Sequence, residues 1–381
     1  MQHENLINGR LHPSRSAGRF TWRAALPPCE ELGDFPRSGP EEVDVARDSL
    51  ARGARPWWKR RHVDRRQLVE RGLARFRAAA LSESSRLAAG FGLDADEFEL
   101  ELRRAVTAGT SAARRARPCP PGVALLMPDW RVHTESLLTN LATILVEGRV
   151  LLLTSDERAP YLPQLLIEEL LDVGLPEDSL ALLHAPNDEA RSVAVSSGIE
   201  RLCAWGDLDR IASLRRVAAG ASVSSQALHL HRACSDRLPR GADPEDAAVE
   251  VLERAFGRCS TFSGTRGGQL STLFVPEGDF SAFSEALVEV MSKDRAYLEP
   301  LPFLDREGPA KARKAWTLGL DEGATLVLGG EVRGAGGRQI QPTLMTNGAA
   351  HMRIARRVEP TPVLLLCRER SKRGVVRVED E

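Results

Sequence analysis

Four short apolar segments that do not alternate with polar residues constrain the fold of this chain more than any other feature. They are residues 122–127, 149–153, 180–183 and 202–205. Amphipathic helices are expected at 134–146, 160–171 and 208–218. Strands that are apolar on both faces and that alternate with helices indicate a parallel sheet covered on both sides. The sequence therefore predicts an α/β protein with a doubly wound domain of the nucleotide-binding type, whose ligand crevice lies at the carboxyl ends of the strands.

The segment before these strands predicts helices. Apolar residues recur at helical spacing over 41–76 and 78–108, and Ser38 with Glu41 forms a candidate capping box at the start. We interpret the basic residues of this region as a solvated helix face, because acidic residues balance them and no aromatic stacking platform is interleaved. They are Arg52, Arg55, Lys59, Arg60, Arg61, Arg65 and Arg66.

Composition limits the classes of function. A chain of 381 residues favours two domains, and a net charge of −1 argues against a molecule built as a whole for nucleic acid or a membrane surface. The six cysteines are far apart with no C-x-x-C, which argues against zinc and redox pairs. No apolar run reaches the ~18 residues of a transmembrane helix, and the polar start is unlike a signal peptide. We expect a soluble cytoplasmic protein with reduced thiols and no nucleic-acid or membrane partner.

The stretch 256–275 is the candidate substrate loop. It is rich in Gly, Ser and Thr, it contains Cys259, and it lies between an expected helix at 244–255 and a strand at 273–275. Its glycines permit close backbone approach, and such loops commonly carry the nucleophile of an α/β enzyme. For Cys259 itself, a small residue packed at a helix end is the more ordinary interpretation than a displaced nucleophile.

Several motifs occur in an order typical of one known family. They are LINGRL at 6–11, LATILVEGRVLLLTSDERAP at 141–160, DVGLP at 172–176, ADPEDAA at 242–248, EGATLVLGG at 322–330, QPTLMT at 341–346 and MRIARRVEPTPVL at 352–364. Over nearly its whole length the chain resembles the aldehyde dehydrogenase family, as a divergent and C-terminally short member. The resemblance implies N-terminal helices and a Rossmann-like nucleotide-binding domain over 1–230, and a truncated catalytic-type α/β domain over 231–381. It also implies oxidation of aldehydes with NAD or NADP through a thiohemiacetal on cysteine.

By this resemblance, the positions that hold the cofactor are partly replaced. Thr154 stands where the family has a ribose-binding lysine, and the loss of a charged hydrogen bond costs roughly 1.5–3 kcal/mol. Glu157 keeps the second ribose ligand. Trp205 and Gly206 belong to the segment that matches F-T-G-S, in which Asp207 replaces the serine and is expected to cap the following helix.

The catalytic positions implied by the resemblance are replaced as well. Trp130 occupies the place of the asparagine that donates to the oxyanion, His229 that of the glutamate base, and Val358 that of the glutamate that holds the nicotinamide ribose. Four alignments of the nucleophile motif give four different residues, none of them cysteine. These are Ser260, Ser263, Gly267 and Ser271.

Three functional hypotheses follow from these observations. The first is a divergent aldehyde dehydrogenase that binds NAD(P) and uses Cys259. The second, favoured by the replaced positions, is an inactive relative that binds or regulates a partner such as a complete dehydrogenase subunit. The third is a hydrolase in which Ser260, Ser263 or Ser271 is activated by His229. Because the connector 108–122 is short and the chain stops at Glu381, the homo-oligomer usual in the family is not expected.

Overall fold

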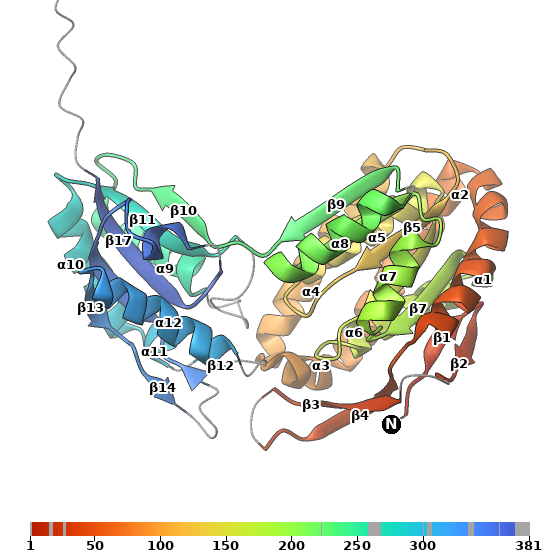
Figure 1. Cartoon of the computed structure of the whole chain (residues 1–381), viewed down its shortest axis with the longest axis horizontal. Coiled ribbons are helices and arrows are strands. Elements are labelled where there is room, and N and C mark those ends of the chain that lie inside the picture. The colour runs from red at the N-terminus through yellow and green to blue at the C-terminus, as the bar shows by residue number, and fades with distance from the viewer. Residues whose placement is uncertain are drawn as a thin grey trace, which may run out of the picture. The chain divides into compact units, whose positions relative to one another are not determined.

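The chain forms two compact units, which are described separately. The computed structural model describes residues 2–14, 18–25, 28–221, 223–257, 268–299, 301–302, 307–333, 339–357 and 359–369. The N-terminal unit is Met1–His231 and the C-terminal unit is Arg232–Glu381 (Figure 1).

The N-terminal unit begins with two hairpins and four helices and continues as alternating strands and helices. Its strands are β1 (Asn5–Ile7), β2 (Arg10–His12), β3 (Arg19–Arg23), β4 (Glu31–Pro36), β5 (Val123–Met127), β6 (Val150–Ser155), β7 (Leu180–His184), β8 (Arg201–Gly206) and β9 (Ser225–Leu230). Its helices are α1 (Pro40–Lys59), α2 (His62–Ser82), α3 (Ser84–Phe91), α4 (Ala95–Arg115), α5 (Thr134–Glu147), α6 (Tyr161–Asp172), α7 (Asp188–Ser196) and α8 (Leu208–Gly220).

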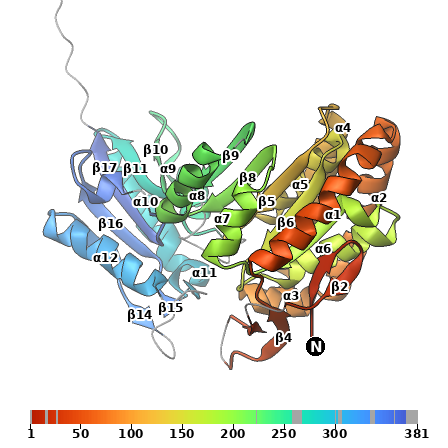
Figure 2. The ribbon, with the colours of Figure 1, turned by 45° about the vertical axis from the view of Figure 1, so that its right-hand side comes forward.

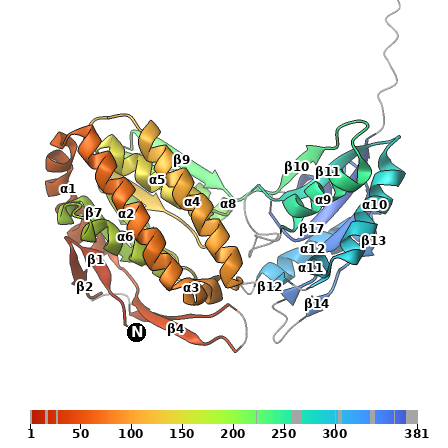
Figure 3. The ribbon, with the colours of Figure 1, turned by 180° about the vertical axis from the view of Figure 1, so that it is seen from behind.

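A seven-stranded sheet organises this unit. The strand order is β2-β1-β7-β6-β5-β8-β9, in which β7 to β9 are parallel and β1 joins β7 antiparallel. Helices α7 and α8 lie on one side of the strands and α5 and α4 on the other (Figure 2). The view from behind shows α2, α4 and α6 in front of the sheet (Figure 3). The α/β class and the doubly wound parallel sheet predicted from the sequence are confirmed.

The start of the first helix differs from the sequence prediction. The capping interaction uses Glu42, whose carboxylate accepts a hydrogen bond of 2.7 Å from the backbone N–H of Gly39, and the predicted pair of Ser38 and Glu41 is wrong. Ser38 instead donates to Asn5 at 3.0 Å, inside a buried polar network. The long helical stretch also divides, because the chain turns between α1 and α2 at Arg60 and Arg61.

One member of the basic region, Arg65, is buried. Its guanidinium donates to the carbonyl oxygens of Trp58 (2.8 Å) and Arg60 at the end of α1. It also donates to the carbonyls of Val146 (3.1 Å) and Glu147 (3.4 Å) at the end of α5. Because helix C-termini leave carbonyl groups unpaired and carry partial negative charge, this cation stabilises two helix ends at once. The interpretation of Arg65 as part of a solvated face is therefore wrong.

A buried histidine joins the ends of β6 and β7. The Nε2 atom of His184 lies 2.8 Å from Oε1 of Gln164, and Nδ1 lies 2.8 Å from Oγ of Ser155. Since an amide oxygen only accepts, Nε2 carries the proton and Nδ1 accepts from the hydroxyl. Burial lowers the pKa of His184 to about 3, and the neighbouring His3 contributes to this shift. The ring is therefore neutral in the folded protein.

The pKa of His184 predicts a loss of stability in acid. Because its folded pKa lies below the ordinary value near 6.5, the native state binds fewer protons than the unfolded state as the pH falls from about 6.5 toward 3. The contribution of neutral His184 to the free energy of unfolding is complete above pH 6.5, and about 2 kcal/mol of it is lost by pH 5. Between pH 7 and pH 5, the free energy of unfolding measured with urea should fall by about 2 kcal/mol less in His184→Gln than in the parent protein. The control His351→Gln, at an exposed position, should keep the parental loss, and an equal loss in all three proteins would contradict the prediction.

The C-terminal unit contains a second, smaller sheet. Its strands are β10 (Cys234–Arg237), β11 (Leu270–Pro276), β12 (Leu301–Pro302), β13 (Thr325–Leu328), β14 (Val332–Arg333), β15 (Gln339–Ile340), β16 (Thr343–Gly348) and β17 (Val363–Glu369). Its helices are α9 (Pro244–Ala255), α10 (Phe280–Lys293), α11 (Arg295–Leu298) and α12 (Gly308–Asp321). The main sheet has the order β10-β11-β17-β16-β13, and only β13 is antiparallel to its neighbour.

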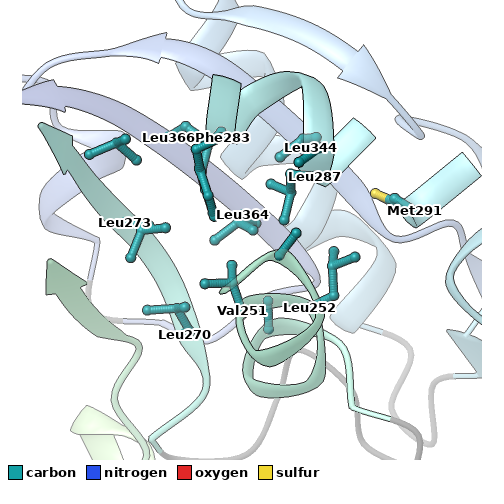
Figure 4. Close-up of a cluster of buried hydrophobic side chains, with 14 of the residues drawn as sticks. Val251, Leu252, Leu270, Leu273, Phe283, Leu287, Met291, Leu344, Leu364 and Leu366 are labelled. Atoms are coloured by element: carbon teal, nitrogen blue, oxygen red, sulfur yellow. The ribbon is translucent and has the colours of Figure 1, made fainter. Parts of the chain in front are cut away.

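A compact apolar core holds this second sheet to its helices. Val251 and Leu252 of α9 and Phe283, Leu287 and Met291 of α10 converge on Leu270, Leu273, Leu344, Leu364 and Leu366 of the strands (Figure 4). This packing fixes the strand that follows the candidate substrate loop. Within the described residues of both units, no helix combines the length and the apolar character needed to cross a bilayer.

Candidate functional site

The strand order places a topological switch point between β5 and β8, where a ligand crevice is expected. From β5 the chain builds β6 and β7 on one side and then returns to build β8 and β9 on the other side. In open parallel sheets, ligands bind outside the carboxyl ends of the strands at such a switch point. The residues that follow these strands are Asp129 to Arg131 after β5, Asp207 after β8 and His231 after β9.

Asp129 is the centre of this site. Its carboxylate accepts hydrogen bonds from the backbone N–H of Arg131 (2.8 Å) and from the guanidinium of the same residue (2.8 and 3.1 Å). The Nε2 atom of His231 lies 2.8 Å from Oδ1, the oxygen that also accepts the backbone N–H of Arg131. The side chains of Asp129 and His231 are 3% and 5% exposed. Burial opposes ionisation, but His231, Arg131 and Arg210 outweigh it and hold the pKa of Asp129 well below its ordinary value.

Further charges extend this contact into a cluster. Arg131 reaches Asp207 at 3.8 Å, and Arg210 lies 3.9 Å from Asp156, which follows β6. Burial lowers the pKa of Arg210, and the charge of Arg191 adds to the effect. We call this set the ion-pair cluster. Its members are Asp129, Arg131, Asp156, Asp207, Arg210 and His231.

The N-terminus of α8 closes the crevice from one side. Asp207 caps this helix, because its carboxylate accepts a hydrogen bond of 3.0 Å from the backbone N–H of Arg210. The side chain of Arg210 lies directly over Gly206, where an added Cβ would come within 2.7 Å of the Cδ atom of Arg210. Gly206 therefore gives room to an arginine of the same chain.

Three aromatic residues predicted as site residues lie at this edge of the sheet. Trp130 is 3% exposed, and the guanidinium of Arg158 lies 5.0 Å from its ring centroid. Trp205 stacks on His229 with ring centroids 4.7 Å apart. Burial, together with the charge of His231, lowers the pKa of His229. Among the described residues no carboxylate hydrogen-bonds His229, since Asp129 faces His231 instead.

The other predicted site residues have different surroundings. Thr154 is 2% exposed near the end of β6, and Glu157 forms an ion pair with Arg37 that includes a contact of 3.1 Å. Ser271 is buried in β11 and donates to the carbonyl of Cys234 at 3.0 Å, which does not suit a nucleophile. Cys259, Ser260, Ser263 and Val358 lie outside the described residues.

Two carboxylates oppose the binding of a dinucleotide at this switch point. Its pyrophosphate would have to displace the carboxylate of Asp207 from the helix N-terminus and approach the buried charge of Asp129. Nε of Arg210 lacks a hydrogen-bond partner among the described residues, which favours an anion. The cluster nevertheless contains three carboxylates against two guanidinium groups. Within the same residues, no group of three His, Cys, Asp or Glu side chains could hold a metal ion.

Sequence reasoning missed five members of the cluster. Asp129, Arg131, Asp156, Arg210 and His231 were not predicted as site residues, although each follows a strand or begins the helix after it. The available signal was position, because polar residues after neighbouring parallel strands meet at one edge of the sheet. The match to family motifs directed attention to His229, two residues before the histidine that contacts Asp129.

Comparison with known sequences gives a consistent family. The model of the aldehyde dehydrogenase family matches residues 27–380. Succinate semialdehyde dehydrogenase [NAD(P)+] of Escherichia coli is 23% identical over 356 residues, which are 85% of this chain and 74% of that protein. Aldehyde dehydrogenase 1 of Tanacetum cinerariifolium is 26% identical over 271 residues, 68% of this chain and 52% of that one. The chain thus spans about half of the length of some of its relatives.

Solved structures share the fold. The NAD-dependent aldehyde dehydrogenase of Sinorhizobium meliloti has a TM-score of 0.87 at 19% identity, with 97% of this chain and 78% of that chain covered. The NADP-dependent glyceraldehyde-3-phosphate dehydrogenase of Bacillus halodurans, solved with NADP, has a TM-score of 0.85 at 20% identity, with 97% and 82% covered. The sequence match over most of the chain, together with this fold, leads to one assignment. The chain belongs to the aldehyde dehydrogenase family.

Proposed function

We propose that this chain is a family member that acts by binding a partner and does not catalyse NAD(P)-dependent oxidation of aldehydes. The observation that carries this proposal is the ion-pair cluster, whose charged side chains take up the switch point between β5 and β8. The names of several relatives and fold neighbours include NAD, NADP or NAD(P)+. Loss of dinucleotide binding is therefore the clearest difference between this chain and those proteins that an experiment can test.

Two further contacts support the proposal. The carboxylate of Glu157 is paired with Arg37, so a ribose hydroxyl would have to compete with a guanidinium for it. Thr154 supplies no charge and is almost inaccessible. Thr154 and Asp207 replace residues that the resemblance assigns to cofactor binding. The remaining one, Glu157, is already paired with Arg37.

The partner that we propose is a complete dehydrogenase subunit, since a chain of the same fold can present matching surfaces to it. We also propose that the protein is cytoplasmic. The described cysteines are free thiols, which supports the cytoplasmic location predicted from the sequence.

Calorimetric titration with NAD and with NADP tests this function. We expect no binding heat at concentrations up to about 1 mM, whereas the Escherichia coli relative serves as the positive control. Aldehydes mixed with either cofactor should give no NAD(P)H absorbance. Binding to a complete dehydrogenase subunit should be measurable by co-purification and by a change in that enzyme's rate.

Two other results would replace this proposal. Dinucleotide-dependent aldehyde oxidation that disappears in Cys259→Ala would establish the chain as a dehydrogenase. Ester hydrolysis that disappears in His229→Ala would establish a hydrolase, in spite of the missing carboxylate beside that ring.

A further inference from the structure

A cluster of exposed basic side chains lies at the end of the N-terminal unit away from the crevice. We call it the basic patch, and its members are Arg52, Arg55, Lys59, Arg60, Arg115 and Arg117. Arg52, Arg55 and Lys59 are spaced along one face of α1, whereas Arg115 and Arg117 lie at the end of α4 and just beyond it. Since the chain next enters the amino end of β5, the patch lies at the amino edge of the sheet.

Two hydrogen bonds bring these segments together. Nε1 of Trp58 donates to the carbonyl of Cys119 at 2.8 Å, and Nε2 of His62 contacts the carbonyl of Ala116 at 3.0 Å. These contacts tie the junction of α1 and α2 to the connector after α4. The basic side chains from both segments therefore form one surface.

The six side chains of the basic patch form no ion pairs with the described residues. Asp178, which lies close to Gly53 beside Arg52, has no ion-pair partner there either, whereas the other neighbouring carboxylates are already engaged. Asp64 pairs with Arg61, Glu70 with Arg114, and Glu147 with both Arg149 and Arg201. The patch therefore keeps its positive charge although the chain as a whole is nearly neutral.

An aromatic side chain lies within the basic patch. Trp58 is 39% exposed between the basic residues of α1 and α2, and its bond to Cys119 fixes the orientation of the ring. The sequence interpretation found no aromatic stacking platform in this cluster, and the structure adds that one aromatic ring, that of Trp58, is exposed within it. Trp and Arg are enriched among the residues that contribute most to protein interfaces.

We propose that the basic patch binds an acidic segment of a protein partner, with Trp58 as its apolar anchor. Within the described residues the patch offers one exposed aromatic ring and no series of rings on which successive bases could stack, which argues against single-stranded nucleic acid. The large exposed apolar side chains at this junction are Trp58 and Val63, too few to insert into a bilayer. The inference goes beyond the proposed function and does not depend on it, since it concerns the edge of the sheet opposite the crevice.

Fluorescence anisotropy with a labelled oligoglutamate peptide tests the proposal. The parent protein should bind the peptide at low salt, and added salt should weaken the binding. Lys59→Gln/Arg60→Gln/Arg117→Gln should lower the affinity about tenfold or more. The matched control, Arg215→Gln/Arg216→Gln/Lys314→Gln, removes the same charge at exposed positions elsewhere and should bind like the parent. Trp58→Phe should weaken binding and abolish any change of indole fluorescence that the peptide causes.

Three results would overturn the proposal. They are no peptide binding by the parent protein, equal losses in the patch variant and in its control, and tighter binding of single-stranded oligothymidylate than of oligoglutamate. The last result would assign the patch to nucleic acid. Titration of NAD(P) at the crevice gives a separate readout, so either proposal can fail while the other stands.

Discussion

Replacement of Asp129 by asparagine should lower the free energy of unfolding of the N-terminal unit by about 3–5 kcal/mol. Asparagine keeps the shape of the side chain but removes the charge that compensates Arg131 and replaces one of the two oxygens that accept hydrogen bonds. Since the side chain of Asp129 is 3% exposed and that of Arg131 is 12% exposed, water cannot restore the lost interaction. A buried cation left without its partner carries most of this cost.

The measurement is urea unfolding followed by tryptophan fluorescence. Five of the six tryptophans lie in the N-terminal unit, so the signal reports mainly on that part of the chain. Asp207→Asn is the matched control, because it removes the same charge from a side chain that is 49% exposed and keeps a good helix cap. It should cost less than about 1 kcal/mol. If Asp129→Asn lowered the free energy of unfolding by less than about 1 kcal/mol, this would contradict the importance that we assign to the ion-pair cluster.

Arg65→Met should have an effect of similar size, about 3–5 kcal/mol. Methionine fills much of the space but cannot donate hydrogen bonds, so the carbonyl groups at the ends of α1 and α5 lose their donor in a buried position. Arg65 itself is 2% exposed, and its pKa is lowered by burial. The carbonyl groups that Arg65 contacts at the end of α5 belong to residues 81 and 82 positions away in sequence, so these hydrogen bonds also join distant parts of the unit.

Arg61→Met provides the comparison for Arg65. Arg61 is 79% exposed and, among the described residues, pairs with Asp64 one turn further on, so its replacement should change the stability little. The two substitutions are chemically identical and four residues apart. Equal losses of stability would show that the buried hydrogen bonds of Arg65 do not matter.

The sheet was predictable because its strands are apolar on both faces. The segment predicted as 149–153 is β6, which continues through Thr154 and Ser155. The sequence could not indicate this extension, since it depends on pairing with β7, where His184 also accepts the hydroxyl of Ser155. Local pattern thus located the strands, and partners distant in the chain determined where they end.

The candidate site was less predictable, because its contacts join segments far apart in the chain. Asp129 and His231 are 102 residues apart, and neither belongs to a local motif that requires the other. The same holds for Arg65, which is indistinguishable by sequence from the exposed arginines beside it. Burial decides the role of such residues, and burial depends on which helix ends and strand ends meet.

The compensation among Asp129, Arg131 and Arg210 also bears on how readily evolution could change this part of the molecule. Replacement of one charged residue by an uncharged one leaves the opposite charge buried without a partner. Each single substitution is therefore destabilising, even where the combined change is tolerated. Under the proposed function, a cofactor pocket would require several coordinated replacements, and selection would meet a barrier of unstable intermediates. We expect laboratory evolution toward dehydrogenase activity to start from paired changes rather than from single ones.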